Sequence, residues 1–273
     1  MEQTLTQNRR PVGRRKWTPP VPKAAAKAKV IHIRERSLMM LKKDLILRNP
    51  LRLLGQENED IIKSGNLGAV LARHGVGKTA MVIQIALNSL LQQKNVLHIS
   101  LNEPVGKVSL WYQEMFERLA QQYKVSQIDQ LWDAIVPHRF IMTFRAEGFS
   151  APRLEERLTD LTAQDIFLPD MMIIDGLSFD GDIRQEMEAL KHLAQTQSLP
   201  VWFTITTHRH EEPANDGLPI QLSPLHDLFD VAIALNPVKD TIHIRALEGS
   251  FEDNAEPGLV LDPATMLIQS QAE

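Results

Sequence analysis

The segment Ala72–Thr79 constrains the fold more than any other stretch, because two glycines in it join a strand pattern directly to a helix pattern. The apolar run Gly68–Ala72 leads into it and is typical of a short buried strand. A glycine-containing turn that ends in Lys-Thr between a strand and a helix is the context of a phosphate-binding loop. Behind the turn, apolar residues recur at helical spacing, at Met81, Val82, Ile85, Ala86 and Leu90.

The residue types in this turn suit phosphate chemistry. Gly77 lets the backbone approach a phosphate where a Cβ would block it, and the N–H groups at the helix start favour an anion. Lys78 can place an ammonium on the β- and γ-phosphates, and Thr79 can offer its hydroxyl to Mg²⁺. Because the strict pattern has Gly where this chain has Ala72, an ordinary strand–turn–helix with a lysine is the alternative. The predicted nucleotide-binding residues are Arg73, His74, Gly75, Val76, Gly77, Lys78, Thr79 and Ala80.

A second strand pattern, Met171–Asp175, is continuously apolar and ends in a carboxylate. Such a run suits a strand that is buried on both faces of a parallel sheet. The loops at the carboxyl ends of such strands carry the sites of α/β proteins. We therefore predict that Asp175 and Thr79 together form the Mg²⁺ site. The alternative is that Asp175 only caps the turn at Gly176.

The rest of the pattern alternates strands with helices, which predicts an α/β fold with a mostly parallel central sheet that is flanked by helices. The last short strands predict an antiparallel C-terminal extension. We interpret the apolar stripe Val108–Leu119, which includes Trp111, as core packing and not as a base-stacking platform. Further strands are expected at 96–100, 140–144, 201–206, 231–235, 241–247, 258–261 and 265–269, and further helices at 150–162 and 182–197.

Polar residues also follow the strand at 201–206, where a side chain could sense the γ-phosphate. From this group we take His208 as a candidate catalytic residue. The neighbouring His210, Glu211 and Glu212 raise the alternative of a metal site. Histidines on a loop are more often unliganded, so we give that alternative little weight.

The charge is distributed unevenly along the chain. Residues 1–36 hold ten Lys/Arg against Glu2 and Glu35, a charge of +8, which leaves −12 for the remainder because the whole chain carries −4. A basic arm on an acidic body predicts a nucleic acid or an acidic protein surface as partner. The alternatives are a solvated tail and, more weakly, an organellar transit peptide.

Three segments follow from these patterns: a disordered basic arm at 1–36, a helix and connector at 37–66, and a nucleotide-binding domain at 67–270. Ser37 is the expected N-cap of the helix, which should end near Asn49-Pro50. The chain has no cysteine, which excludes disulfides and thiolate metal sites. Since it also has no long apolar run, we expect a cytoplasmic protein without a membrane segment.

Several of these stretches together resemble the RecA-fold P-loop ATPases of the DnaB helicase and KaiC type. The resemblance covers about residues 50–270 and implies a RecA-like domain that binds ATP and Mg²⁺ and often assembles into homo-oligomeric rings or filaments. The matching stretches are Gly68–Ala80, Ile85–Asn88, His98–Glu103, Met172–Asp175, Asp230–Leu235 and the strand at 242–249.

Two departures from that family bear on turnover. In the family a carboxylate after the second strand activates the attacking water. One register places Asn102 there and leaves no base, whereas the register we favour places Glu103 there. Family members also carry Lys and Arg in a late strand that reaches a neighbour's γ-phosphate, but here the matching positions are Ala246 and Glu248, with Arg245 as a substitute.

The expected function is slow ATP hydrolysis that drives assembly or an interaction with a partner or nucleic acid, with Glu103, Lys78 and His208 as catalytic residues. The alternative is a nucleotide-dependent binding or regulatory module without hydrolysis. A nucleic-acid motor and a small-molecule kinase are weaker alternatives. ATP is preferred to GTP because the guanine-reading motif Asn-Lys-x-Asp is missing from the sequence.

Overall fold

The computed structural model describes residues 39–51, 61–248 and 258–270. The basic arm 1–36 and the predicted cap Ser37 lie outside the described residues. Residues from Met40 onward form one compact unit. Residues 39–48 are helical, so this helix ends before Asn49-Pro50 as predicted.

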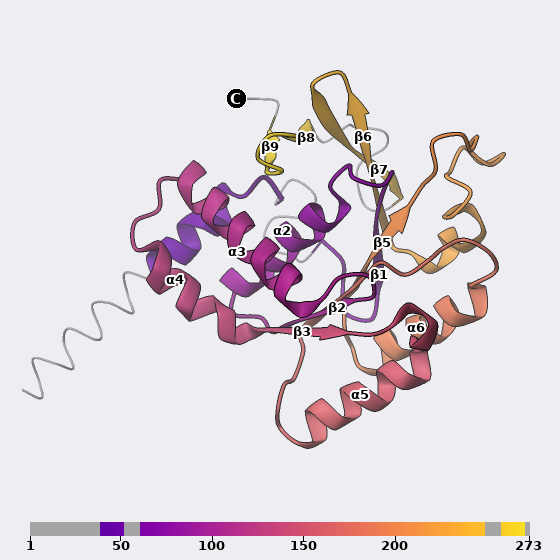
Figure 1. Cartoon of the computed structure of the whole chain (residues 1–273), viewed down its shortest axis with the longest axis horizontal. Coiled ribbons are helices and arrows are strands. Elements are labelled where there is room, and N and C mark those ends of the chain that lie inside the picture. The colour runs from indigo at the N-terminus through magenta and orange to yellow at the C-terminus, as the bar shows by residue number, and fades with distance from the viewer. Residues whose placement is uncertain (1–38, 52–60, 249–257, 271–273) are drawn as a thin grey trace, which may run out of the picture. The chain divides into compact units, whose positions relative to one another are not determined.

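A mixed sheet runs through the described residues (Figure 1). Its strands are β1 (Leu67–Ala72), β2 (Val96–Ser100), β3 (Arg139–Thr143), β4 (Met171–Asp175), β5 (Val201–Thr206), β6 (Val231–Val238), β7 (Thr241–Glu248), β8 (Leu259–Leu261) and β9 (Ile268–Ser270). The longer helices that flank it are α2 (Lys78–Leu91), α3 (Val105–Gln122), α4 (Ile128–Ile135), α5 (Ala151–Ala163) and α6 (Arg184–Thr196).

The strand order within the described chain is β3-β2-β4-β5-β1-β6-β7-β8-β9. The pairs from β3 to β6 are parallel, whereas β7, β8 and β9 join antiparallel. The predicted α/β class, with a mostly parallel sheet and an antiparallel C-terminal extension, is confirmed. One strand, β5, separates β1 from β4, so the ends of these three strands lie beside one another.

Helices cover both faces of the sheet. Alternate residues of a strand point to opposite faces, and Leu67, Ala69 and Leu71 join the core cluster that includes Leu154 of α5 and Leu190 of α6. On the other face α2 contacts β1 and β5, and α3 contacts β3 and α2. Figure 1 shows α2 with α3 and, apart from them, α5 with α6. This layering leaves the carboxyl ends of the parallel strands free to carry a site.

The structure differs from the sequence prediction in several elements, among them α4, the start of β9 and the end of β6, which runs to Val238 and not to Leu235. Helix α4 was not predicted. It has only 8 residues, and just two of them, Leu131 and Ile135, are buried, so its apolar pattern in the sequence is weak. Strand β9 begins at Ile268 and not at 265, because Asp262 closes a turn by accepting a hydrogen bond from the Thr265 hydroxyl at 2.7 Å. None of the helices within the described ranges combines the length and apolarity that crossing a membrane requires.

Candidate functional site

A cavity of about 500 Å³ lies at the carboxyl ends of the parallel strands, and we call it the phosphate-loop cavity. The loop after β1 lines it with His74, Gly75 and Gly77 and, at the start of α2, with Lys78, Thr79 and Ala80. Strands β4 and β5 and the corner after β2 supply the remaining polar groups, among them Asn102, Glu103, Asp175, Thr204 and Thr206. Residues predicted from three separate stretches of sequence therefore meet in one cavity.

Both glycines of the loop adopt the left-handed backbone region, with φ of +79° at Gly75 and +117° at Gly77. A Cβ at Gly77 would lie 2.8 Å from Leu261 Cδ2 and 3.3 Å from Met266 Sδ. A Cβ at Gly75 would meet no described atom within 4 Å. The C-terminal segment thus packs directly on the loop at Gly77, which gives this glycine a packing role beside the predicted approach to a phosphate.

Lys78 lies across the loop. Its ammonium donates hydrogen bonds to the carbonyl oxygens of Ala72 at 3.0 Å and Arg73 at 3.2 Å. Burial lowers the pKa of Lys78, and the Asp175 carboxylate acts in the opposite direction. The side chain therefore presents a partly desolvated cation inside the cavity, where its attraction to an anion is stronger than in water.

The Asp175 carboxylate faces hydroxyl groups and not the turn at Gly176. Oδ2 accepts a hydrogen bond from the Thr79 hydroxyl at 3.0 Å, and Oδ1 accepts one from the Thr204 hydroxyl at 2.6 Å. The Gly176 N–H donates to the Thr204 hydroxyl oxygen at 3.0 Å, which orients that hydroxyl. The geometry thus disfavours a mere capping role for Asp175.

These oxygens fit a magnesium ion. Mg²⁺ prefers oxygen ligands, keeps several waters and is usually held by one or two protein groups together with substrate phosphates. Thr79 and Asp175 supply one hydroxyl and one carboxylate, only 3.0 Å apart. The described residues contain no group of three or more His, Cys, Asp or Glu that could enclose a metal without a substrate.

Both candidates for the water-activating position, Asn102 and Glu103, line the cavity. The Asn102 amide donates to the Gly176 carbonyl oxygen at 3.4 Å. The Glu103 carboxylate forms an ion pair of 2.8 Å with Lys107, one turn further along α3. Glu103 therefore lies in the cavity, but its carboxylate is paired with a lysine that was not predicted from the sequence.

His208 does not belong to the phosphate-loop cavity. Its Nε2 lies 3.0 Å from Asp180 Oδ1, and this hydrogen bond raises the pKa of His208, with a smaller contribution from Glu211. Thr206, the last residue of β5, lines the cavity instead. His208 is therefore not placed with the residues that line the cavity. Arg245, Arg73 and Val76 are likewise not among the lining residues.

Trp111 and Met266 are among the lining residues that were misread or missed in the sequence. Trp111 was assigned to a core stripe, but it is only half-buried, lines the cavity and has the Lys107 ammonium 5.1 Å from its ring centroid. Met266 arrives from the distant C-terminal turn. The buried side chain of Gln84 on α2 holds this turn, since it donates to Met266 O at 2.8 Å and accepts from Ile268 N–H at 2.9 Å. A lone Gln among apolar helix residues was the one available signal.

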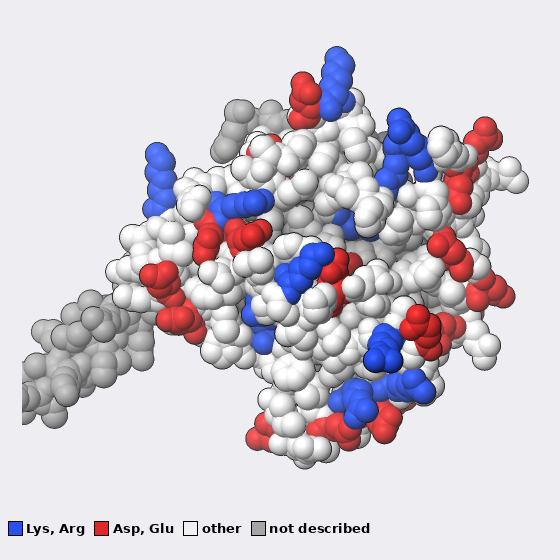
Figure 2. Space-filling model, in the orientation of Figure 1, with Lys and Arg blue, Asp and Glu red and all other residues white. Residues whose placement is uncertain are grey.

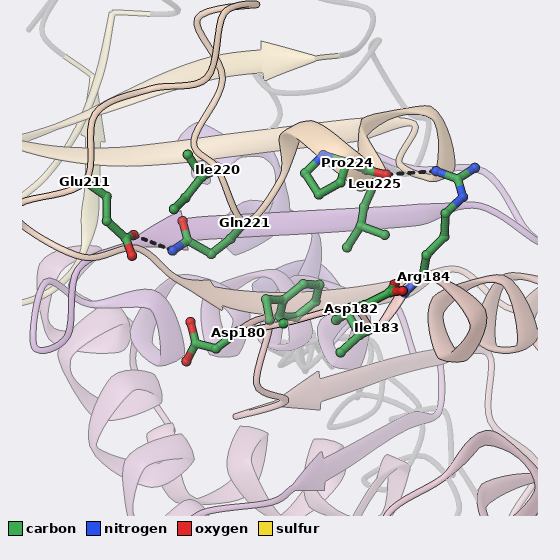
Figure 3. Close-up of a pocket in the computed structure, with 11 residues that line it drawn as sticks. Asp180, Asp182, Ile183, Arg184, Glu211, Ile220, Gln221, Pro224 and Leu225 are labelled. Carbon is green, nitrogen blue, oxygen red and sulfur yellow. Dashed lines mark hydrogen bonds between the residues drawn. The ribbon is translucent and has the colours of Figure 1, made fainter.

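A second cavity of about 460 Å³ is formed by the loops after β4 and β5 and the start of α6. In Figure 3, Arg184 points to the carbonyl of Pro224, and Gln221 points to Glu211. Arg184 also forms a bidentate ion pair with Asp227, at 2.9 and 2.6 Å.

On the face shown in Figure 2, acidic and basic side chains are interspersed and no patch of a single sign dominates.

Comparisons with known proteins add no assignment. No protein-family description matches the chain, and a search of curated proteins finds no relative that matches it.

Proposed function

We propose that this chain is an ATP-binding protein of the RecA-like P-loop kind, and that ATP and Mg²⁺ bind in the phosphate-loop cavity. The observation that carries the proposal is the convergence of Lys78, Thr79 and Asp175 at the start of α2. Lys78 and Thr79 are adjacent in sequence and Asp175 lies 96 residues after Thr79, and together they offer a cation, a hydroxyl and a carboxylate to a metal triphosphate. The glycine turn and the first N–H groups of α2 complete the anion site.

Each side chain has a distinct part in binding. Lys78 exchanges its bonds to the Ala72 and Arg73 carbonyls for bonds to phosphate oxygens. Thr79 and Asp175 hold the magnesium shell, and the ion, when bound, neutralises charge on the phosphates. Thr206 lies at the end of β5, where its hydroxyl can contact the terminal phosphate.

For hydrolysis, Glu103 orients the attacking water. Because Glu103 is paired with Lys107, and the positions that match the family's late-strand Lys and Arg are Ala246 and Glu248, the proposed turnover is slow. A cation that reaches the transferring phosphate can supply a large part of the rate in phosphoryl transfer. Slow hydrolysis suits a cycle that drives assembly or the exchange of a partner.

A second candidate function is a nucleotide-gated module that binds ATP without turnover. The 2.8 Å ion pair between Glu103 and Lys107 favours it, since a carboxylate that is engaged by a lysine is not free to orient a water. Binding then changes assembly or partner choice, while the nucleotide stays intact.

ATP binding and single-turnover hydrolysis decide between the two. Wild type is compared with Glu103→Gln and with Lys78→Ala. Hydrolysis by wild type, together with binding but no hydrolysis by Glu103→Gln, supports the ATPase. Tight binding without turnover by wild type supports the gated module. Equal ATP affinity of wild type and Lys78→Ala contradicts both.

The partner proposal rests on charge alone. Residues 1–36 carry +8 by sequence, so binding to DNA or RNA should weaken steeply with added salt and disappear when these residues are deleted. Equal affinity with and without residues 1–36 would contradict a nucleic-acid partner for this segment.

A further inference from the structure

A buried histidine lies directly below the proposed magnesium site. His98 belongs to β2, two residues before Ser100, and its side chain is completely buried. Its Nδ1 lies 3.0 Å from the Tyr112 hydroxyl. Its Nε2 lies 3.9 Å from Asp175 Oδ2 and has no hydrogen-bond partner among the described residues. An unpaired polar atom in the interior is costly, so a ring nitrogen that points at a site carboxylate calls for an explanation.

The surroundings select one tautomer of the ring. Nδ1 lies 3.0 Å from the Tyr112 hydroxyl, whereas Nε2 faces the Asp175 carboxylate, so the two ring nitrogens have different kinds of neighbour. Burial raises the pKa of Tyr112, so the phenol keeps its proton and can donate it to Nδ1. The ring proton is then on Nε2 and faces Asp175. The opposite tautomer would direct a lone pair at the carboxylate.

Neighbouring elements hold Tyr112 in this position. The Arg139 guanidinium lies 4.8 Å from the centroid of the Tyr112 ring and 5.5 Å from that of Trp132. Arg139 also donates to the Ser109 hydroxyl at 3.3 Å. The phenol is completely buried between these groups and β2. The hydroxyl that orients His98 is therefore fixed by α3, β3 and α4 together.

We propose that His98 is a positioning residue for Asp175, an inference that rests on the proposed function. Its Nε2–H sets the orientation in which Oδ2 reaches Thr79 and the shell of the magnesium ion. At 3.9 Å the contact is longer than a hydrogen bond, and a shift of about 1 Å closes it. Groups that orient a metal-binding carboxylate commonly contribute to metal affinity, and the interior strengthens their effect.

The test separates the magnesium-dependent part of ATP affinity from the rest. ATP is titrated into wild type, His98→Leu, His98→Gln and Tyr112→Phe, once with excess Mg²⁺ and once with EDTA. In His98→Leu and Tyr112→Phe the affinity gained from Mg²⁺ should fall by about 10-fold, the lower end of such orienting effects. The affinity in EDTA should stay unchanged. His98→Gln, which keeps an N–H donor, should recover part of the gain.

The chain offers a matched control in its other tyrosine. Tyr123→Phe removes a hydroxyl that donates to the Arg48 carbonyl oxygen at 3.0 Å, away from the cavity, and should leave the gain from Mg²⁺ unchanged. A spectroscopic readout does not need nucleotide. Long-range ¹H–¹⁵N spectra should show the His98 proton on Nε2 in wild type, and Tyr112→Phe should relax this preference.

The outcomes separate the two proposals. If wild type shows no ATP binding with Mg²⁺, the proposed function is wrong, and this inference fails with it. If Mg²⁺ increases the ATP affinity of wild type, and increases that of Tyr112→Phe and His98→Leu by the same factor, only the role of His98 is overturned. A proton on Nδ1 in the spectra would also overturn it. Melting temperatures of all variants verify that the fold is retained, and Tyr112→Phe keeps the test open if His98→Leu does not fold.

Discussion

The phosphate-loop cavity and the second cavity are nearly equal in size, at about 500 and 460 Å³, and both lie beside loops that follow parallel strands. They differ in how their polar groups are satisfied. In the second cavity the cation Arg184 is bonded to Asp227, Glu188 and the Pro224 carbonyl, and Gln221 is bonded to Glu211. In the phosphate-loop cavity the cation Lys78 is bonded only to backbone carbonyls among the described residues.

This difference indicates which space is built for a ligand. Bonds between neutral carbonyls and an ammonium are readily exchanged for bonds to phosphate, because the ammonium binds an acceptor of opposite charge more strongly than a neutral one. The Arg184–Asp227 pair already has this strength, so an anion gains little by displacing it. The two cavities have similar volumes and differ in charge pairing. Lys78 has no carboxylate as a hydrogen-bond partner among the described residues, whereas Arg184 is bonded to Asp227.

The largest expected effect is the loss of ATP affinity in Lys78→Ala. Because a hydrogen bond to a charged group contributes roughly 1.5–3 kcal/mol, affinity should fall about 10- to 100-fold. Isothermal titration calorimetry measures it, with Lys63→Ala, an exposed lysine, as control. If Lys78→Ala and Lys63→Ala bind ATP equally well, Lys78 does not contribute to ATP binding and the assignment of the phosphate-loop cavity is contradicted.

The next effect is acid sensitivity from the histidine under the first cavity. Burial lowers the pKa of His98 to about 4 in the folded protein, against 6.5 for an ordinary histidine, while the neighbouring Asp175 raises it and Arg139 lowers it further. Between these two pH values only the unfolded chain takes up the proton. The free energy of unfolding is therefore highest above pH 6.5 and falls as the pH is lowered towards 4. From pH 7 to 5 the loss should be roughly 2 kcal/mol. Urea unfolding of wild type and His98→Gln measures it, and equal pH slopes would contradict it.

A smaller effect concerns one glycine from each cavity. Gly77 and Gly181 both have positive φ, at +117° and +97°, but only a Cβ at Gly77 would contact other described residues within 4 Å. Both alanine variants carry backbone strain, and Gly77→Ala adds the clash with Leu261. We expect Gly77→Ala to be less stable than Gly181→Ala by about 1 kcal/mol. Equal unfolding midpoints would show that the C-terminal segment does not pack on the loop.

The smallest expected effect is that of Arg184→Ala on nucleotide affinity. Because the second cavity is independent of the phosphate site in this account, the affinity for ATP should stay within about twofold of wild type. The melting temperature should change little, since exposed ion pairs contribute weakly. A large loss of ATP affinity would show that the nucleotide binds in the second cavity and not in the phosphate-loop cavity.

Several strands could be predicted from the sequence because their signals are local. Strands β2, β4 and β5 have the predicted bounds, since each is a mainly apolar run whose last residue is polar. The placement of Lys78, Thr79, Glu103 and Asp175 in one cavity also follows from the geometry of parallel strands.

Other parts of the site depend on tertiary placement. The helical period alone does not separate a buried position from a half-buried one, which is why Trp111 was assigned to the core. Thr206 ends β5 and lines the cavity, whereas His208, two residues later, does not, and the sequence pattern does not distinguish the two positions. Met266 reaches the loop through the Gln84 side chain, a contact across 182 residues that no local pattern encodes.

Hydrogen–deuterium exchange with and without ATP and Mg²⁺ tests the central claim most directly, because it reports both cavities in one measurement. The account predicts slower exchange at the amides of 73–80 and no change at 180–184 and 211–225. Slower exchange confined to the second cavity, or no change at 73–80 at saturating ATP, would contradict it.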